Sequence, residues 1–73
     1  VARQVLRIAR VMDMTRQLNA EPAGSVGAVD AAEIETFIND ETMYANTSPN
    51  RAFAGEMIAV LTGLRAALET ARA

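Results

Sequence analysis

The sequence of 73 residues contains no cysteine, no histidine and no tryptophan, and its 7 basic residues are all arginine. Without His, Cys or Lys, the chain has no imidazole base, no thiol nucleophile and no amine that forms a Schiff base. The same absences remove the usual ligands of zinc ribbons, iron–sulfur clusters and haem. We therefore expect no catalytic residue, no metal site and no cofactor, and we interpret the chain as a non-enzyme.

Long apolar runs are also absent. The most apolar run, residues 57–64, is bounded by Glu56 and Arg65 and is far shorter than the roughly 18 residues of a membrane-spanning helix. Near the start, Arg3, Arg7 and Arg10 interrupt any stretch that would resemble a secretory signal peptide. Because the lack of cysteine is also typical of a reducing compartment, these features predict a cytoplasmic protein without a membrane span.

The small size of the chain points to a partner. A chain of 73 residues forms one domain at most, and such a domain buries only somewhat more than about 60% of the surface of its unfolded chain. Small domains usually add disulfides, a metal or a partner to gain stability. Since the first two have no suitable side chains here, we expect association with further copies or with a larger protein.

Hydrophobic periodicity predicts an all-α fold of three helices, over about residues 2–19, 31–45 and 49–71. No alternating pattern predicts a strand. We expect a single domain over residues 1–73, composed of a basic N-terminal helix (1–20), a Gly/Pro loop (21–29) and a helical hairpin (30–73).

The apolar residues of each helix recur at the helical period and predict the core. The predicted core side chains are Val1, Val5, Ile8 and Met12 in the first helix, with Val11 and Leu18 widening the stripe; Ile34, Phe37, Ile38 and Tyr44 in the second; and Phe53, Met57, Val60, Leu61, Leu64 and Leu68 in the third.

Two sequence signals predict where the second and third helices begin. Asp30 and Glu33 have the spacing of a capping box, which places Asp30 at the N-cap of the second helix. Ser48 followed by Pro49 predicts an N-cap and a first helical residue for the third helix.

The charges divide unevenly along the chain. Residues 1–20 carry four arginines and one acid, whereas residues 21–73 carry three arginines and eight acids, which together give the net charge of −2. Arg3, Arg7 and Arg10 lie on one flank of the first helix and suggest a ridge that binds anions such as nucleic-acid phosphates. The alternative is a solvated face, or one that pairs with the acidic second helix.

Two surfaces are candidates for contact with another chain. The back of the third helix carries small residues at helical spacing, which let a second helix approach closely; these are Ala52, Gly55, Ala59, Thr62, Gly63 and Ala66. An alanine-rich composition that simply fills an exposed face is the alternative. Leu6 and Met14 lie outside the main stripe of the first helix and predict a partner-facing flank.

Glu41 falls within the apolar arc of the second helix, where a carboxylate needs a cationic partner. Arg16 is the candidate partner; the alternative is that the helix frays or bends near residue 41. Tyr44, Asn46, Asn50 and Arg51 near the second joint suggest a small polar pocket. An arginine-lined anion site with catalytic activity would require a cleft where at least two arginines from different helices converge.

These observations predict a non-enzymatic helical assembly or protein-interaction module, acting as a homo-oligomer or as a small subunit of a larger complex. The alternative is a small nucleic-acid-binding regulator that uses Arg3, Arg7 and Arg10, with the acidic C-terminal part mediating dimerisation.

Overall fold

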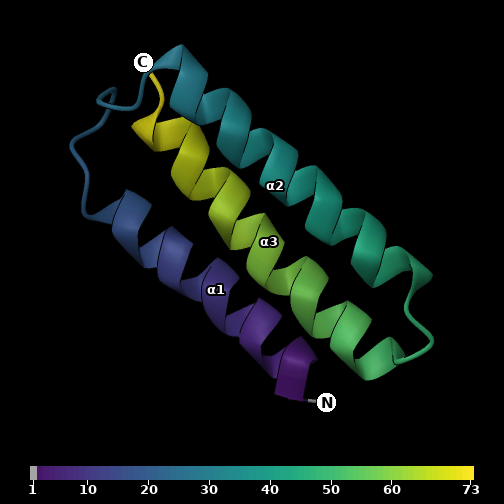
Figure 1. Cartoon of the computed structure of the whole chain (residues 1–73). Helices are drawn as coiled ribbons and strands as arrows, with labels where there is room; N and C mark the ends of the chain where they lie inside the picture. The colour runs from purple at the N-terminus through teal and green to yellow at the C-terminus, as the bar shows by residue number, and fades with distance from the viewer. Residues whose placement is uncertain (1) are drawn as a thin grey trace.

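The computed structural model describes residues 2–73 and consists of three α-helices (Figure 1). The helices are α1 (Ala2–Asn19), α2 (Ala28–Thr47) and α3 (Arg51–Ala71). Helix α3 lies between α1 and α2, parallel to α1 and antiparallel to α2 (Figure 1). Within residues 2–73 the sole extended pairing is an isolated bridge between Val26 and Arg72. The expected all-α fold of three helices is confirmed.

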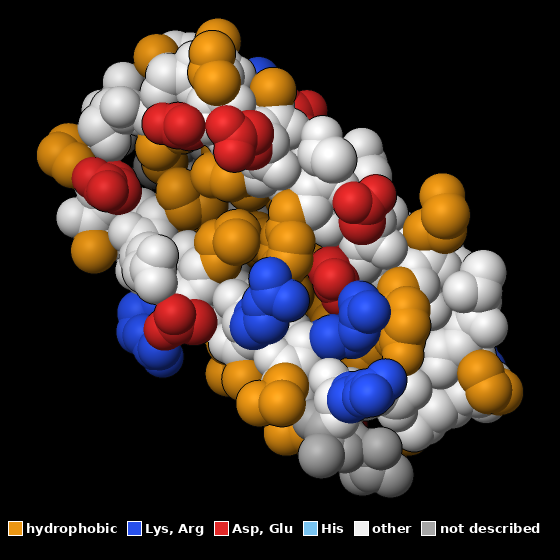
Figure 2. Space-filling view, viewed as in Figure 1, with side chains coloured by type: hydrophobic (Ala, Val, Ile, Leu, Met, Phe, Trp, Pro, Cys, Tyr) orange, Lys and Arg blue, Asp and Glu red, His pale blue; other side chains and the backbone are white. Residues whose placement is uncertain are grey.

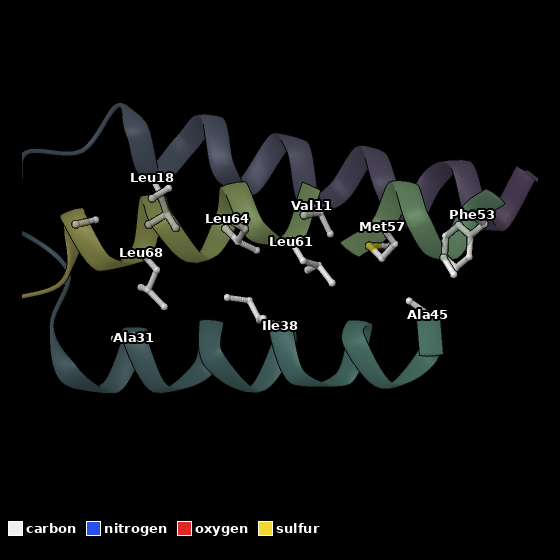
Figure 3. Close-up of a cluster of buried hydrophobic side chains, with 13 residues drawn as sticks. Val11, Leu18, Ala31, Ile38, Ala45, Phe53, Met57, Leu61, Leu64 and Leu68 are labelled. Atoms are coloured by element: carbon white, nitrogen blue, oxygen red, sulfur yellow. The ribbon is translucent and has the colours of Figure 1, made fainter. Parts of the chain in front are cut away.

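The core is built around one face of α3 (Figure 3). Its buried apolar residues are Val11 and Leu18 of α1, Ala31, Ile38 and Ala45 of α2, and Phe53, Ala54, Met57, Leu61, Leu64, Ala67, Leu68 and Ala71 of α3. The stripe predicted for the third helix is confirmed, since Val60 is also partly buried against this cluster. Ile34 and Phe37 of α2 are partly buried beside it.

The predicted core face of α1 is confirmed for Ile8, Val11 and Leu18 and wrong for Val5 and Met12. Val5 and Met12 are 60% and 52% exposed, whereas Val11 and Leu18 are buried. Ile8 packs against the edge of the core, and Val1 lies outside the described residues. Helix α1 is therefore rotated so that the side opposite Leu6 and Ala9, centred near Val11, faces α3.

Helix α2 begins one turn earlier than predicted. Its N-cap is Gly27, in extended backbone and without a side-chain cap. The carbonyl oxygen of Gly27 accepts the N–H of Ala31 at 2.9 Å, which places Asp30 inside the first turn. There its carboxylate interacts favourably with the positive end of the helix dipole, but it does not cap the helix.

Helix α3 is capped by Asn50 and not by Ser48. The Asn50 side chain accepts the backbone N–H of Phe53 at 3.1 Å. Ser48 instead ends α2, because its own N–H donates to the Ala45 carbonyl and its hydroxyl accepts the N–H of Asn50. Pro49 thus sits in the joint between the two caps.

The loop between α1 and α2 is fastened to the C-terminal end of α3. The N–H of Gly24 donates to the Thr70 carbonyl at 3.3 Å, and the N–H of Val26 donates to the Ala71 carbonyl at 2.8 Å. Gly24 has a φ of 77°, in the left-handed region that side chains disfavour. This one residue turns the loop toward α3.

We predict that Gly24→Ala lowers the free energy of unfolding by about 1–2 kcal/mol, because a Cβ disfavours the left-handed backbone. Gly63→Ala is the matched control. Gly63 lies inside α3, and an added Cβ would meet no atom within 4 Å, so this change should raise stability by up to about 1 kcal/mol. Urea unfolding of dilute, monomeric protein followed by circular dichroism measures both; destabilisation by both would contradict the assignment.

Candidate interaction surfaces

An ion pair between α1 and α2 replaces the one predicted for Glu41. Nη1 of Arg7 donates to both carboxylate oxygens of Glu41, at 3.0 and 2.9 Å. Glu41 is only 6% exposed, and α2 continues without a break to Thr47. The expected fraying near residue 41 is therefore wrong, and so is the pairing with Arg16, which pairs with Asp13 on its own helix.

The rotation of α1 explains why Arg7 is the partner. With Val11 facing α3, Arg7 lies at the margin of the buried face, on the side of α2, and Arg16 points to solvent. The guanidinium carbon of Arg7 also lies 3.6 Å from the centre of the Tyr44 ring. The Tyr44 ring packs edge to face against the ring of the buried Phe53, with 5.8 Å between the two ring centres. The ion pair is therefore linked to the core through these two rings.

Polar side chains join the start of α1 to the α2–α3 joint. Asn50 donates from Nδ2 to Oε1 of Gln4 at 2.9 Å, and Gln4 donates to the Ser48 hydroxyl at 3.4 Å. Arg51 donates to the Ser48 carbonyl. The polar groups near this joint, suggested as a pocket by the sequence, thus cap helices and hold α1. Sequence reasoning missed Gln4, because a single Gln on a helix carries no signal for its partner.

The three arginines of the proposed anion ridge share one flank of α1, and two of them contact α2. Arg7 is held by Glu41, and the guanidinium carbon of Arg10 lies 5.6 Å from the centre of the Phe37 ring. Arg3 is exposed. The sequence offered pairing with the second helix as the alternative to phosphate binding, and Arg7 makes such a contact. The binding of nucleic acid by this ridge stays a prediction.

The predicted Leu6/Met14 flank divides into two environments. Leu6 is 62% exposed, whereas Met14 packs against the core. Met14 also lines a hollow of about 320 Å³ between α1 and α2, together with Gln17, Leu18, Glu21, Val26, Asp30, Glu33 and Ile34. Three of these eight side chains are acidic, so the hollow has an apolar floor and an acidic rim.

The small residues on the back of α3 form a face exposed to solvent. This small-residue face consists of Ala52, Gly55, Ala59, Thr62, Gly63 and Ala66, all of which are exposed. A Cβ added at Gly55 or Gly63 would meet no atom within 4 Å. Along one side, a second hollow of about 350 Å³ lies at the surface where α1 and α3 meet, lined by Met12, Thr15, Arg16, Asn19, Val60 and Gly63.

The fold and these surfaces define a small all-α protein of three helices. Comparison with known protein families, with curated protein sequences and with solved structures found no match. Within residues 2–73, no helix is long and apolar enough to cross a membrane. The same residues hold no group of three His, Cys, Asp or Glu side chains placed to bind a metal ion.

We predict that Arg7→Met lowers the free energy of unfolding by about 3 kcal/mol, because it leaves the buried Glu41 carboxylate without its cation. The double variant Arg7→Met/Glu41→Leu should recover most of this loss, since an apolar pair of similar size needs no compensation. Urea unfolding of both variants measures the difference.

Arg16→Met is the control for this experiment. It removes an ion pair with Asp13 that lies on the exposed surface of α1, so the change should stay below about 1 kcal/mol. Equal effects at positions 7 and 16 would show that burial does not distinguish the two pairs.

Proposed function

We propose that the protein is a non-enzymatic helical assembly module that packs the small-residue face of α3 against a helix of another chain. That helix belongs to a second copy or to a larger protein in which this chain is a small subunit. We place the module in the cytoplasm, which stays a prediction from the sequence.

The observation that carries this proposal is the presence of two glycines, Gly55 and Gly63, inside α3. Each glycine inside a helix costs about 1 kcal/mol relative to alanine. Neither Gly55 nor Gly63 has a neighbour that would exclude a Cβ, so packing within this chain does not account for them. A partner helix that approaches closely would account for both, because a glycine lets two helix backbones approach each other.

A second feature of the same surface supports the proposal. Val5 and Met12 are exposed on α1, and Met12 lines the hollow beside Gly63. Small side chains next to larger apolar ones match the ridges and grooves by which helices pack. The α1–α3 hollow thus offers a groove for the larger side chains of a partner helix.

We predict that Ala59→Leu weakens association of the protein, because a large side chain in the centre of the small-residue face separates the two helices. Ala32→Leu, which makes the same change at an exposed position of α2, should leave association unchanged. Sedimentation equilibrium at 10–300 micromolar protein measures the mass, and circular dichroism checks that helicity is kept. A cooperatively folded monomer throughout this range contradicts self-association.

A further inference from the structure

The side of the molecule opposite the small-residue face carries charges of opposite sign at its two ends. Figure 2 shows arginines gathered over the lower half, several acidic side chains at the upper left and hydrophobic side chains between them; single acidic side chains also lie beside the arginines. We call this surface the charged face. Its members are Arg3, Arg7 and Arg10 at the basic end, Met14, Ile34 and Phe37 in the middle, and Glu21, Asp30 and Glu33 at the acidic end.

Most of the charges on this face have no ion-pair partner within residues 2–73. Among residues 2–73, the ion pairs are Arg7–Glu41, Arg16–Asp13, Arg72–Glu35 and Arg72–Glu69. In this part of the chain, Arg3 and Arg10 at the basic end therefore lack a carboxylate within ion-pair distance. Of the three carboxylates at the acidic end, none has an arginine of the described residues within ion-pair distance.

The two groups of unpaired charge lie at opposite ends of the space between α1 and α2. Arg3 and Arg10 lie in the first half of α1, whereas Glu21 follows the end of that helix and Asp30 and Glu33 lie in the first two turns of the antiparallel α2. At 1.5 Å per residue, Arg3 lies about 10 Å beyond Arg10. A two-fold axis through the middle of the face would thus bring the basic end of one copy over the acidic end of another.

The face is also large enough for a specific contact. The molecule measures 37 by 18 by 16 Å. One long face therefore presents roughly 600 Å², and two facing copies would bury on the order of 1,200 Å², the lower end of specific interfaces. Between the charged ends, Met14, Ile34 and Phe37 supply an apolar centre.

We propose that two copies of this chain form an antiparallel dimer through the charged face, with Arg3 and Arg10 of each copy paired to the acidic end of the other. A two-fold contact requires a surface that is complementary to itself, and unpaired charges of opposite sign on either side of an apolar centre meet that requirement. The contact is separate from the small-residue face and does not depend on it.

The test uses two charge reversals on the full chain. The basic-end variant is Arg3→Glu/Arg10→Glu, and the acidic-end variant is Asp30→Arg/Glu33→Arg. Arg7 is left in place because it holds the buried Glu41. Both variants and their parent carry Ala59→Leu, so that any contact through the small-residue face is removed and the two proposals are tested apart.

In sedimentation equilibrium at low salt, the parent should be a dimer, and each variant alone should dimerise at least about tenfold more weakly, because like charges now face each other. An equimolar mixture should return to the dimer mass, since both ends of the mixed pair are again opposite in sign. Recovery in the mixture also shows that both variants are folded. Added salt at about 0.5 M should weaken the parent dimer.

Arg16→Glu/Arg65→Glu is the control for net charge. It makes the same charge change as the basic-end variant, at exposed positions outside the charged face, and it should keep the dimerisation constant of the parent. Three results would each overturn the dimer: a monomeric parent, variants that keep the parent mass, or a mixture that stays monomeric. If the Ala59→Leu protein has a lower mass than the unsubstituted protein, this result supports the proposed function even where the dimer through the charged face is overturned.

Discussion

Helix α3 is the constraint on which the rest of the structure depends, because it packs against both other helices while they stay apart. Within residues 2–73, no Cα atom of α1 lies within 8 Å of one in α2. The space between these two helices is therefore closed by long side chains. Arg7 reaches Glu41 and Tyr44, and Arg10 reaches Phe37. The charged face is a consequence of this spacing.

The ion pair between Arg7 and Glu41 also accounts for the orientation of α1. A rotation that buried Val5 and Met12 would gain about 1.5–3 kcal/mol for each side chain, but it would lose a similar amount by exposing Val11 and Leu18. The same rotation would move Arg7 away from Glu41. An unpaired buried carboxylate costs several kcal/mol, so the charged pair decides between two orientations that apolar burial leaves nearly equal.

This balance explains which parts of the fold could be predicted from the sequence. In α3 the large apolar residues fall within one arc and the small ones opposite, so its buried face was predicted correctly. In α1 the apolar residues spread around more of the helix than the core covers. Gln4 and Arg7 lie at the edge of its buried face because their polar side chains bind Asn50 and Glu41. Periodicity cannot weigh such contacts, because they depend on which residues of α2 and of the α2–α3 joint come near.

Glu41 shows the same limit at the level of a single site. Its place in the apolar arc of α2 identified a buried carboxylate that needed a cation, and the structure confirms that burial. The choice among the four arginines of α1 required the rotation of that helix. The predicted caps of α2 and α3 were wrong for a related reason. Asp30 and Ser48 have the local sequence of an N-cap, but the path of the preceding loops makes Gly27 and Asn50 the N-caps instead.

The two candidate surfaces differ in the physics that would hold a partner, and this difference follows from their places on the fold. The back of α3 is nearly free of charge and offers close approach of backbones, a contact that depends little on salt. The charged face offers unpaired ions around a small apolar centre, a contact that weakens as salt screens it. Because the surfaces lie on opposite sides of a single central helix, neither contact obstructs the other. Copies joined through both would either close into a ring of dihedral symmetry or extend into a chain, according to the angle between the two axes.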